Sequence, residues 1–399
     1  VAVACSDFTL RLHDKRSLRR LRTLAGHTGP VSAVRFAHRS VSSFYSASLD
    51  GTVRLWDARS PETKQAQVFK SDASHCFSSF DLSCSDSLLC GGTEQVNGED
   101  SFLVFWDVRK PGGVLLGVYS ESHSDDITQV RFHPTDKDRL ASGSTDGLVN
   151  VFDLSEGAED EALVGTCNSE SSVSALCWLG LERLLCVSHD EGLRLWDLKS
   201  LDTEDELTVY STRDARVAEG QGSAGSALDY LIGGCWLDSE GQVLVVGGSG
   251  GGDVHLFTCD RAGLSPVRTL TSGHTATVRC FGFDSQSLSL FTGGEDVQLL
   301  RWSREETGSG PGPEQAVGSS RQQQSSEEEE EQVQSKRPMK SESVMRLKSR
   351  PTRHTSSTET RSTCDRDPTS KAPVVLVSGF YSHIEELSGG VAGENAVIL

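Results

Sequence analysis

Residues 123–153 are HSDDITQVRFHPTDKDRLASGSTDGLVNVFD, and they contain three short apolar runs, at 127–132, 140–144 and 148–152. Each run has five or six residues, which is the length of a β-strand and too short for a typical helix. The sequence TDG at 145–147 separates the last two runs and favours a tight hairpin turn. The stretch therefore predicts an antiparallel meander, which cannot bury both of its faces alone.

The end of this meander recurs along the chain. Seven strand-turn-strand endings close at Asp14, Asp57, Asp107, Asp153, Asp197, Thr258 and Ser303. Their separations of 43 to 61 residues suit the four-stranded blades of a propeller. We therefore predict an all-β fold, a seven-bladed β-propeller, over residues 1–303.

The first of the seven repeats is shorter than the others. The other six have an aromatic residue at the end of the first predicted strand, namely Phe36, Phe80, Phe132, Trp178, Trp236 and Phe283. Residues 1–4 already match a second strand, so we expect the first blade to be truncated at its N-terminal side. Closed propellers complete one blade with a strand from the opposite end of the chain. Residues 374–377 are a candidate strand against the open last blade, as the less favoured alternative to disorder of this segment.

Composition limits the class of protein. There are 38 Lys and Arg residues against 57 Asp and Glu, a net charge of −19, which disfavours general nucleic-acid binding and favours protein partners. The eleven cysteines include no C-x-x-C pair and predict reduced thiols, as in the cytoplasm or nucleus. No apolar run is long enough for a membrane span. We expect a monomer without a cofactor or bound metal, in the cytoplasm and/or nucleus.

Short motifs resemble a known family. GH at 26–27 followed by LWD at 55–57, and GH at 273–274 followed by RW at 301–302, resemble WD repeats, the seven-bladed propeller family, over residues 1–303. The resemblance implies a structural hydrogen-bond network of four side chains within a blade. Its members would be His27, Ser46, Asp50 and Trp56 in one repeat, and His274, Thr292, Asp296 and Trp302 in another. A third set, His123, Ser142 and Asp146, has Phe152 in place of the indole donor.

The same residue types are those of a hydrolytic triad, which is the alternative interpretation. A catalytic set needs one special copy, whereas this one is repeated, so we favour the structural role. GGSGG at 247–251 matches a nucleophile elbow, but the strand-like DVHLF that follows favours a hairpin. His123, Asp125 and Asp126 lack a fourth ligand at the spacing of a metal site.

The most specific functional motif is WDAR at 56–59, followed one repeat later by WDVR at 106–109. Two adjacent repeats ending in W-D-x-R resemble the signature of substrate receptors that dock onto the cullin-4 ubiquitin ligase through its propeller adaptor. Arg59 and Arg109 leave the same strand of neighbouring blades, so we expect them on one face, where they can bind a partner. Alternatively, each arginine pairs with an aspartate on its own surface.

Three segments depart from the repeat pattern. Residues 94–101 and 202–226 are predicted to be insertions that form exposed loops. Residues 304–399 include GSGPGP and five consecutive glutamates at 327–331, a composition that predicts a disordered tail.

The predicted function is that of a non-catalytic protein-interaction scaffold. The ligase receptor is the more specific alternative. An enzyme such as a hydrolase is disfavoured, because no unique nucleophile, base and oxyanion arrangement is present.

Overall fold

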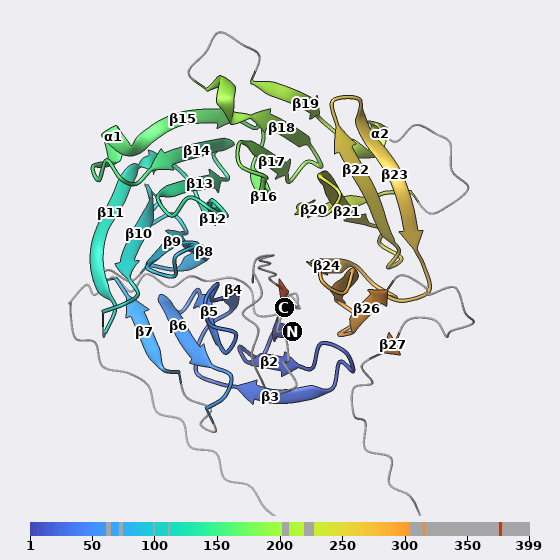
Figure 1. The fold of residues 1–399 in the computed structure, drawn as a ribbon, viewed down its shortest axis with the longest axis horizontal. Helices are drawn as coiled ribbons and strands as arrows, with labels where there is room; N and C mark the ends of the chain where they lie inside the picture. The colour runs from blue at the N-terminus through green and yellow to red at the C-terminus, as the bar shows by residue number, and fades with distance from the viewer. Residues whose placement is uncertain are drawn as a thin grey trace, which may run out of the picture. The chain divides into compact units, whose positions relative to one another are not determined.

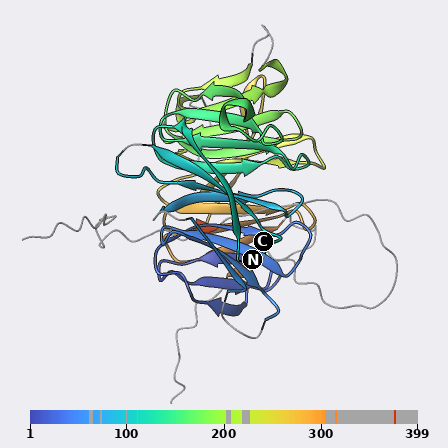
Figure 2. The same cartoon turned by 90° about the vertical axis from the view of Figure 1, so that its left-hand side faces the viewer.

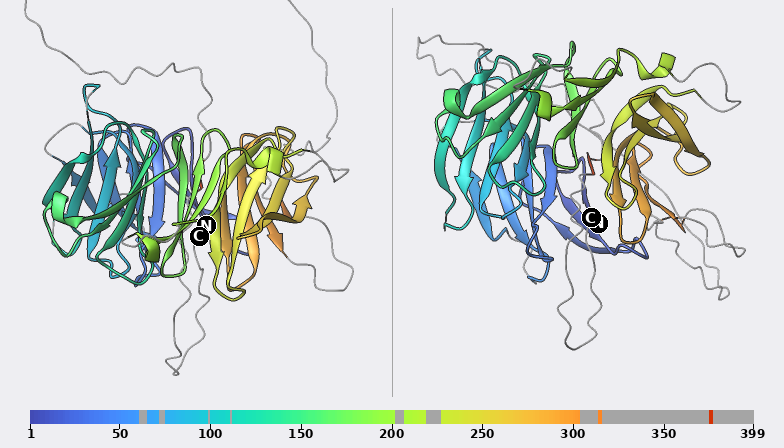
Figure 3. Two further views of the ribbon diagram at one scale, coloured as in Figure 1. Left: turned by 90° about the horizontal axis from the view of Figure 1, so that it is seen from above. Right: turned by 45° about the horizontal axis from the view of Figure 1, so that its top comes forward.

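The computed structural model describes residues 1–60, 65–71, 75–98, 100–110, 112–201, 207–218 and 227–303, with the backbone at 314–315 and 375–376. The strands of these residues form seven four-stranded antiparallel sheets. They belong to one compact unit, Val1–Ala316 with Thr369–Leu399, and the sheets follow one another around a common centre as blades (Figure 1). Figure 2 and the left panel of Figure 3 show the blades edge-on, and the right panel of Figure 3 shows them obliquely. The prediction of a seven-bladed propeller is confirmed.

The first four blades, with strands ordered from innermost to outermost, cover the N-terminal half of the propeller. Blade 1 consists of β28 (Val375–Leu376), β1 (Ala2–Ala4), β2 (Leu10–His13) and β3 (Arg20–Leu24). Blade 2 consists of β4 (Val31–Phe36), β5 (Ser43–Ser48), β6 (Thr52–Asp57) and β7 (Gln67–Lys70). Blade 3 consists of β8 (Phe77–Leu82), β9 (Leu88–Thr93), β10 (Ser101–Asp107) and β11 (Val114–His123). Blade 4 consists of β12 (Ile127–Phe132), β13 (Arg139–Ser144), β14 (Leu148–Asp153) and β15 (Leu163–Asn168).

The remaining blades follow the same plan. Blade 5 consists of β16 (Val173–Leu179), β17 (Arg183–Ser188), β18 (Leu193–Asp197) and β19 (Thr208–Thr212). Blade 6 consists of β20 (Tyr230–Leu237), β21 (Gln242–Gly248), β22 (Val254–Asp260) and β23 (Gly263–Leu270). Blade 7 consists of β24 (Val278–Asp284), β25 (Ser289–Gly294), β26 (Leu299–Ser303) and β27 (Glu314–Gln315). Helical turns in the described ranges are α1 (Glu159–Ala162), η1 (Leu198–Ser200) and α2 (Ala215–Ala218).

The meander predicted from residues 123–153 is the first three strands of blade 4. Val130 of β12 faces Ser142 of β13, which in turn faces Asn150 of β14. The turn between β13 and β14 contains Gly147 with a φ of 83°, a left-handed conformation that glycine adopts without steric cost. The apolar alternation and the turn residues therefore placed these strands correctly.

The strand that completes blade 1 was assigned to the wrong blade. β28, drawn red near the centre of Figure 1, pairs antiparallel with β1, with Val3 opposite Leu376. Blade 7 instead takes its outermost strand from β27, with Leu300 opposite Gln315. The physical reason is that β1 has a free inner edge, whose backbone groups need partners.

Both β27 and β28 fall within residues 304–399, which we predicted to be a tail, so this segment contributes to the fold. The prediction of disorder for its other residues lies outside the described part of the chain.

The supposed insertion at 202–226 is also partly wrong. It contains β19, the outermost strand of blade 5, and the turn α2. The sequence of β19, TVYST, lacks a buried apolar residue, and its side chains are half-buried or exposed. An outermost strand needs little burial, so its apolar pattern is weak and hard to recognise. Residues 202–206 and 219–226 lie outside the described residues.

The apolar core lies between adjacent blades. For example, Leu195 of β18 belongs to one buried cluster with Val243 of β21 and Phe257 of β22. Each sheet thus buries both faces against its neighbours, which a single meander cannot do. None of the helices in the described ranges has the length and apolar character of a membrane span.

Candidate functional site

In blade 2 the structure brings together the four predicted polar side chains. Nδ1 of His27 lies 2.9 Å from Oδ2 of Asp50, and Nε2 lies 2.7 Å from the hydroxyl of Ser46. The indole N–H of Trp56 donates to the same hydroxyl oxygen at 2.8 Å. These residues come from the loop before β4, from β5, from the β5–β6 turn and from β6. The chain of bonds therefore ties four segments of the chain together in one blade.

The charge on Asp50 determines which atoms donate. Burial by itself raises the pKa of Asp50, but hydrogen bonds from His27, Thr52 and the backbone N–H of Thr28 outweigh it, so the pKa lies below its usual range. The ionised carboxylate only accepts, so Nδ1 of His27 donates to it. In the neutral imidazole Nε2 then accepts from Ser46, whose oxygen is left to accept from the indole.

Blade 7 repeats this arrangement with a threonine. Nδ1 of His274 lies 3.0 Å from the Asp296 carboxylate, and Nε2 lies 2.8 Å from the hydroxyl of Thr292. The indole N–H of Trp302 donates to that hydroxyl oxygen at 2.8 Å. The second predicted set is thus also assembled in full.

Blade 4 contains three of the four groups. Nδ1 of His123 lies 3.0 Å from Asp146, and Nε2 lies 2.7 Å from the hydroxyl of Ser142. The fourth position is Phe152, which is fully buried and packs against Tyr119 with 5.6 Å between ring centroids. Phe152 therefore packs as an aromatic ring where blades 2 and 7 have tryptophan, but it has no N–H to donate to Ser142.

These sets are poorly arranged for nucleophilic chemistry. The hydroxyl-bearing residues Ser46, Ser142 and Thr292 are 0% exposed, whereas a nucleophile must reach its substrate. GGSGG at 247–251 joins β21 to β22 in an antiparallel hairpin, as predicted. Over the described residues, no group of three His, Cys, Asp or Glu side chains is placed to hold a metal ion.

Arg59 and Arg109 each follow the third strand of a blade, β6 and β10, so they lie on the same face of neighbouring blades. Their side chains are 76% and 69% exposed. Each also forms a two-point ion pair with the aspartate that ends its own strand. In Arg59, Nε and Nη2 lie 3.2 and 3.0 Å from the carboxylate of Asp57. In Arg109, both distances to Asp107 are 2.9 Å.

The ion pairs have an electrostatic consequence. Hydrogen bonds from the guanidinium of Arg109 lower the pKa of Asp107 to about 2, and those from Arg59 lower the pKa of Asp57. Both carboxylates are therefore ionised at neutral pH. The alternative in which each W-D-x-R arginine pairs with its own aspartate is thus confirmed, and both arginine side chains are also exposed.

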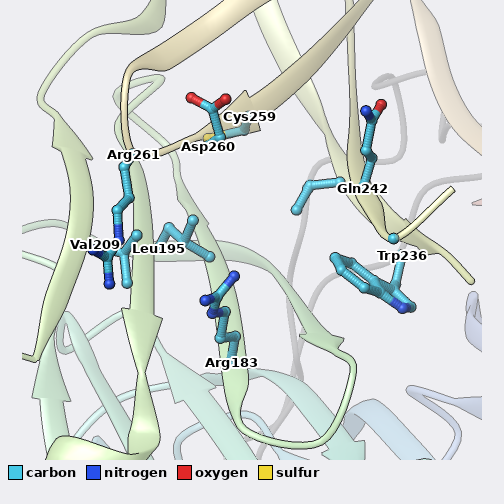
Figure 4. A pocket seen from close by; sticks show the side chains of 10 residues that line it. Arg183, Leu195, Val209, Trp236, Gln242, Cys259, Asp260 and Arg261 are labelled. Atoms are coloured by element: carbon cyan, nitrogen blue, oxygen red, sulfur yellow. The ribbon is translucent and has the colours of Figure 1, made fainter.

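A cavity that sequence reasoning missed lies between blades 5 and 6 (Figure 4). Arg183, Trp236 and Arg261 lie around it, and they come from β17, β20 and the turn after β22. No motif joins residues so far apart in the sequence. The only sequence signal was the aromatic residue at the end of the first predicted strand of six repeats, of which Trp236 is one.

Comparison with known proteins identifies the type of repeat in this chain. The family profile "WD domain, G-beta repeat" matches residues 18–57, 113–153 and 264–296. Together with the seven four-stranded sheets, this shows a β-propeller that contains WD repeats at the matched residues.

Within that class, the chain is similar to the WD repeat-containing protein 89 homolog of Dictyostelium discoideum. The two are 26% identical, over 76% of this chain and 79% of the relative. It is also 29% identical to WD repeat-containing protein GTS1 of Arabidopsis thaliana, over 77% of this chain and 78% of the relative.

Solved structures share the fold. The Cps50 (Swd1) β-propeller domain of Myceliophteria thermophila superposes with a TM-score of 0.57 and 17% identity, over 76% of this chain and 93% of that domain. At this level of identity the likeness concerns the fold alone.

Proposed function

We propose that the chain is a non-catalytic scaffold that binds other proteins through exposed side chains of a rigid propeller. The observation that carries this proposal is the contrast between the buried His-Ser/Thr-Asp sets and the exposed arginines. The polar groups best suited to chemistry are fully buried and bond to one another within a blade. The charged groups available to a partner, such as Arg59 and Arg109, lie on the surface.

The proposal includes the setting in which the scaffold acts. The net charge of −19 supports protein partners rather than general nucleic-acid binding. We place the chain in the cytoplasm and/or nucleus, as a monomer without a cofactor. Fluorescence microscopy of the tagged chain tests its location. Light scattering of the purified chain tests its oligomeric state, and a stable dimer would contradict the proposed monomer.

A second, more specific candidate is docking to the adaptor of the cullin-4 ligase through Arg59 and Arg109. The observation that favours it is their exposure on one face of neighbouring blades. A guanidinium has five N–H donors, and the ion pair with the strand-ending aspartate uses one on Nε and one on Nη2. The remaining donors are held in a fixed orientation in which they can meet a carboxylate or carbonyl of a partner.

Affinity capture from cells tests both candidates. The intact chain is compared with the double variant Arg59→Ala, Arg109→Ala, and circular dichroism checks that both fold. The adaptor should be captured by the intact chain and lost from the double variant. If neither sample captures the adaptor, the ligase candidate fails, and reproducible capture of other proteins would still support the scaffold.

Arg216 provides a matched control. Its Nε and Nη2 lie 2.8 and 2.9 Å from the Asp214 carboxylate, the same two-point geometry, but it follows a fourth strand rather than a third. The variant Arg216→Ala should capture the adaptor as the intact chain does. Equal losses in both variants would indicate a nonspecific charge effect.

The hydrolase alternative has its own test. A fluorescent hydrolase probe is incubated with the chain and with Ser46→Ala. We expect no labelling that depends on this serine, because its hydroxyl is buried and bonded to His27. Labelling that disappears in the variant would contradict the non-catalytic proposal.

A further inference from the structure

The cavity between blades 5 and 6 has a volume of about 200 Å³. It opens where the third strands of these blades end, which is the same face as that of Arg59 and Arg109. The residues that line it are Arg183, Leu195, Val209, Trp236, Gly241, Gln242, Val243, Cys259, Asp260 and Arg261. None of them belongs to the His-Ser/Thr-Asp sets or to the W-D-x-R motifs, so the cavity is separate from both.

The inner part of the cavity is apolar. Leu195, Val243 and Cys259 are at most 5% exposed, and the half-buried Val209 and Trp236 pack against the same cluster. Burial raises the pKa of the Cys259 thiol to about 12, so this group is neutral at physiological pH. An apolar cavity of about 150 Å³ accepts a benzene-sized molecule. The space between the two blades therefore suits one leucine- or phenylalanine-sized side chain.

The rim of the cavity carries two arginines, together with Asp260. Arg183 and Arg261 are exposed, and neither guanidinium donates a hydrogen bond to any residue that the structure describes. Arg183 forms an ion pair with Asp197, whose Oδ2 lies 3.6 Å from Nε, and this distance is too long for a hydrogen bond. The carboxylate of Asp260 accepts the backbone N–H of Ala262 at 2.7 Å and points away from Arg183 in Figure 4.

This charge pattern indicates the chemistry of the partner. Hydrogen bonds from a guanidinium to a carboxylate are charge-assisted and stronger than neutral ones. Two exposed arginines whose N–H groups have no described hydrogen-bond acceptor, beside an apolar cavity, suit an acidic rather than a basic ligand.

We propose that this cavity binds a peptide segment of a partner protein in which a large apolar side chain is flanked by Asp or Glu. The apolar side chain enters beside Trp236, and the carboxylates accept hydrogen bonds from Arg183 and Arg261. The inference rests on the proposed scaffold function and specifies one class of partner that the scaffold binds. It does not depend on docking of the ligase adaptor by Arg59 and Arg109.

Fluorescence polarisation tests the proposal on the full chain. The probes are fluorescein-labelled peptides with a central Leu, Met, Phe or Trp flanked by Asp or Glu. Matched peptides carry Ala at the centre, or Asn and Gln in place of the acids. We expect saturable binding of at least one acidic apolar peptide, and dissociation constants about tenfold higher for both matched forms.

Variants of the chain locate the site. Arg183→Gln and Arg261→Gln should each raise the dissociation constant about tenfold, and Val209→Phe, which fills the cavity, should abolish saturable binding. Lys137→Gln removes an equal charge from the β12–β13 turn, where the side chain is 59% exposed, and should leave binding unchanged. Circular dichroism and the thermal midpoint confirm that each variant folds.

Two outcomes would overturn the proposal. One is the absence of saturable binding by every peptide. The other is binding that persists in folded Val209→Phe and that weakens in Lys137→Gln as much as in the arginine variants, which is the behaviour of nonspecific charge attraction. Either result leaves the scaffold function standing if the affinity capture still returns partner proteins, so the two failures are distinguishable.

Discussion

Blades 2 and 4 contain the same histidine, serine and aspartate and differ in the aromatic residue. In blade 2 the indole N–H of Trp56 donates to Ser46, and in blade 4 Phe152 has no such donor. The distance from Nε2 of the histidine to the serine oxygen is nevertheless 2.7 Å in both blades. The bonds between histidine, hydroxyl and carboxylate therefore form without the indole, and the aromatic ring is kept for packing.

A different polar residue reinforces blade 4. Nδ2 of Asn150 donates to the carbonyl oxygen of Ser122 at 2.7 Å, and its Oδ1 accepts from the Thr166 hydroxyl at 2.7 Å. The asparagine thereby ties β14 to β15 and to the end of β11. The comparison indicates that the carboxylate–histidine pair is the essential part of the network and that its outer bonds can be replaced.

The largest expected effect is that of removing the carboxylate. Asp50→Ala leaves Nδ1 of the buried His27 and the N–H of Thr28 without their acceptor, so the free energy of unfolding should fall by about 3 kcal/mol. Urea unfolding followed by circular dichroism measures it. Glu240→Ala, at an exposed position, is the control and should have little effect. A loss below about 1 kcal/mol would contradict the essential role of the pair.

The next effect is that of the indole. Trp56→Phe makes blade 2 resemble blade 4, and it should lower the free energy of unfolding by about 2 kcal/mol, through the lost hydrogen bond and the smaller ring. Trp302→Phe in blade 7 should behave similarly, because the bond it removes has the same length. No measurable change in either unfolding curve would mean that the indole donor adds nothing to stability.

The reverse exchange, Phe152→Trp, offers Ser142 the missing donor. Phe152 is fully buried against Tyr119, so the larger ring should overpack the site and destabilise the chain by about 1.5 kcal/mol. Thermal unfolding compares this variant with the intact chain. A higher midpoint would show that the missing bond limits the stability of blade 4.

A smaller effect is expected at Asn150. Asn150→Ala removes the donor to Ser122 and the acceptor for Thr166, and should cost about 1 kcal/mol. The urea midpoint provides the measurement. Removing the indole from blade 2 should therefore cost more than removing the asparagine from blade 4, and the opposite order would reverse the roles assigned to these two side chains.

The smallest expected effect is the change in the stability of the fold between neutral and mildly acidic pH. In Asp50 and Asp146 burial raises the pKa, but hydrogen bonds led by those from the histidine side chains outweigh it, so both pKa values are lowered in the folded chain. The unfolded value is about 3.9, so the stabilisation is complete above about pH 5 and is lost as pH falls through 4 toward the folded values.

Thermal midpoints between about pH 7 and pH 3.5 test this sign. The variants Asp50→Asn and Asp146→Asn should each show a shallower acid-induced decrease than the intact chain. Parallel curves for the variants and the intact chain would assign the acid sensitivity to other groups.

Much of the fold could be predicted because it depends on local patterns. Strand length, alternation and turn residues placed the meander of residues 127–153 correctly. The polar strand Thr208–Thr212 was missed, because an outermost strand has little apolar signal. The histidine, hydroxyl and aspartate partners could be named because they recur at similar spacing in three of the repeats.

The sequence by itself determined the number of blades, the meander of blade 4 and the polar residues that meet within blades 2, 4 and 7, because those interactions join segments close along the chain. Only the tertiary structure decided that β28 pairs with β1 rather than with blade 7. It also decided that Arg59 and Arg109 turn back onto their own aspartates. The cavity beside Trp236 likewise depends on the packing of one blade against the next, which brings together side chains that no local pattern relates.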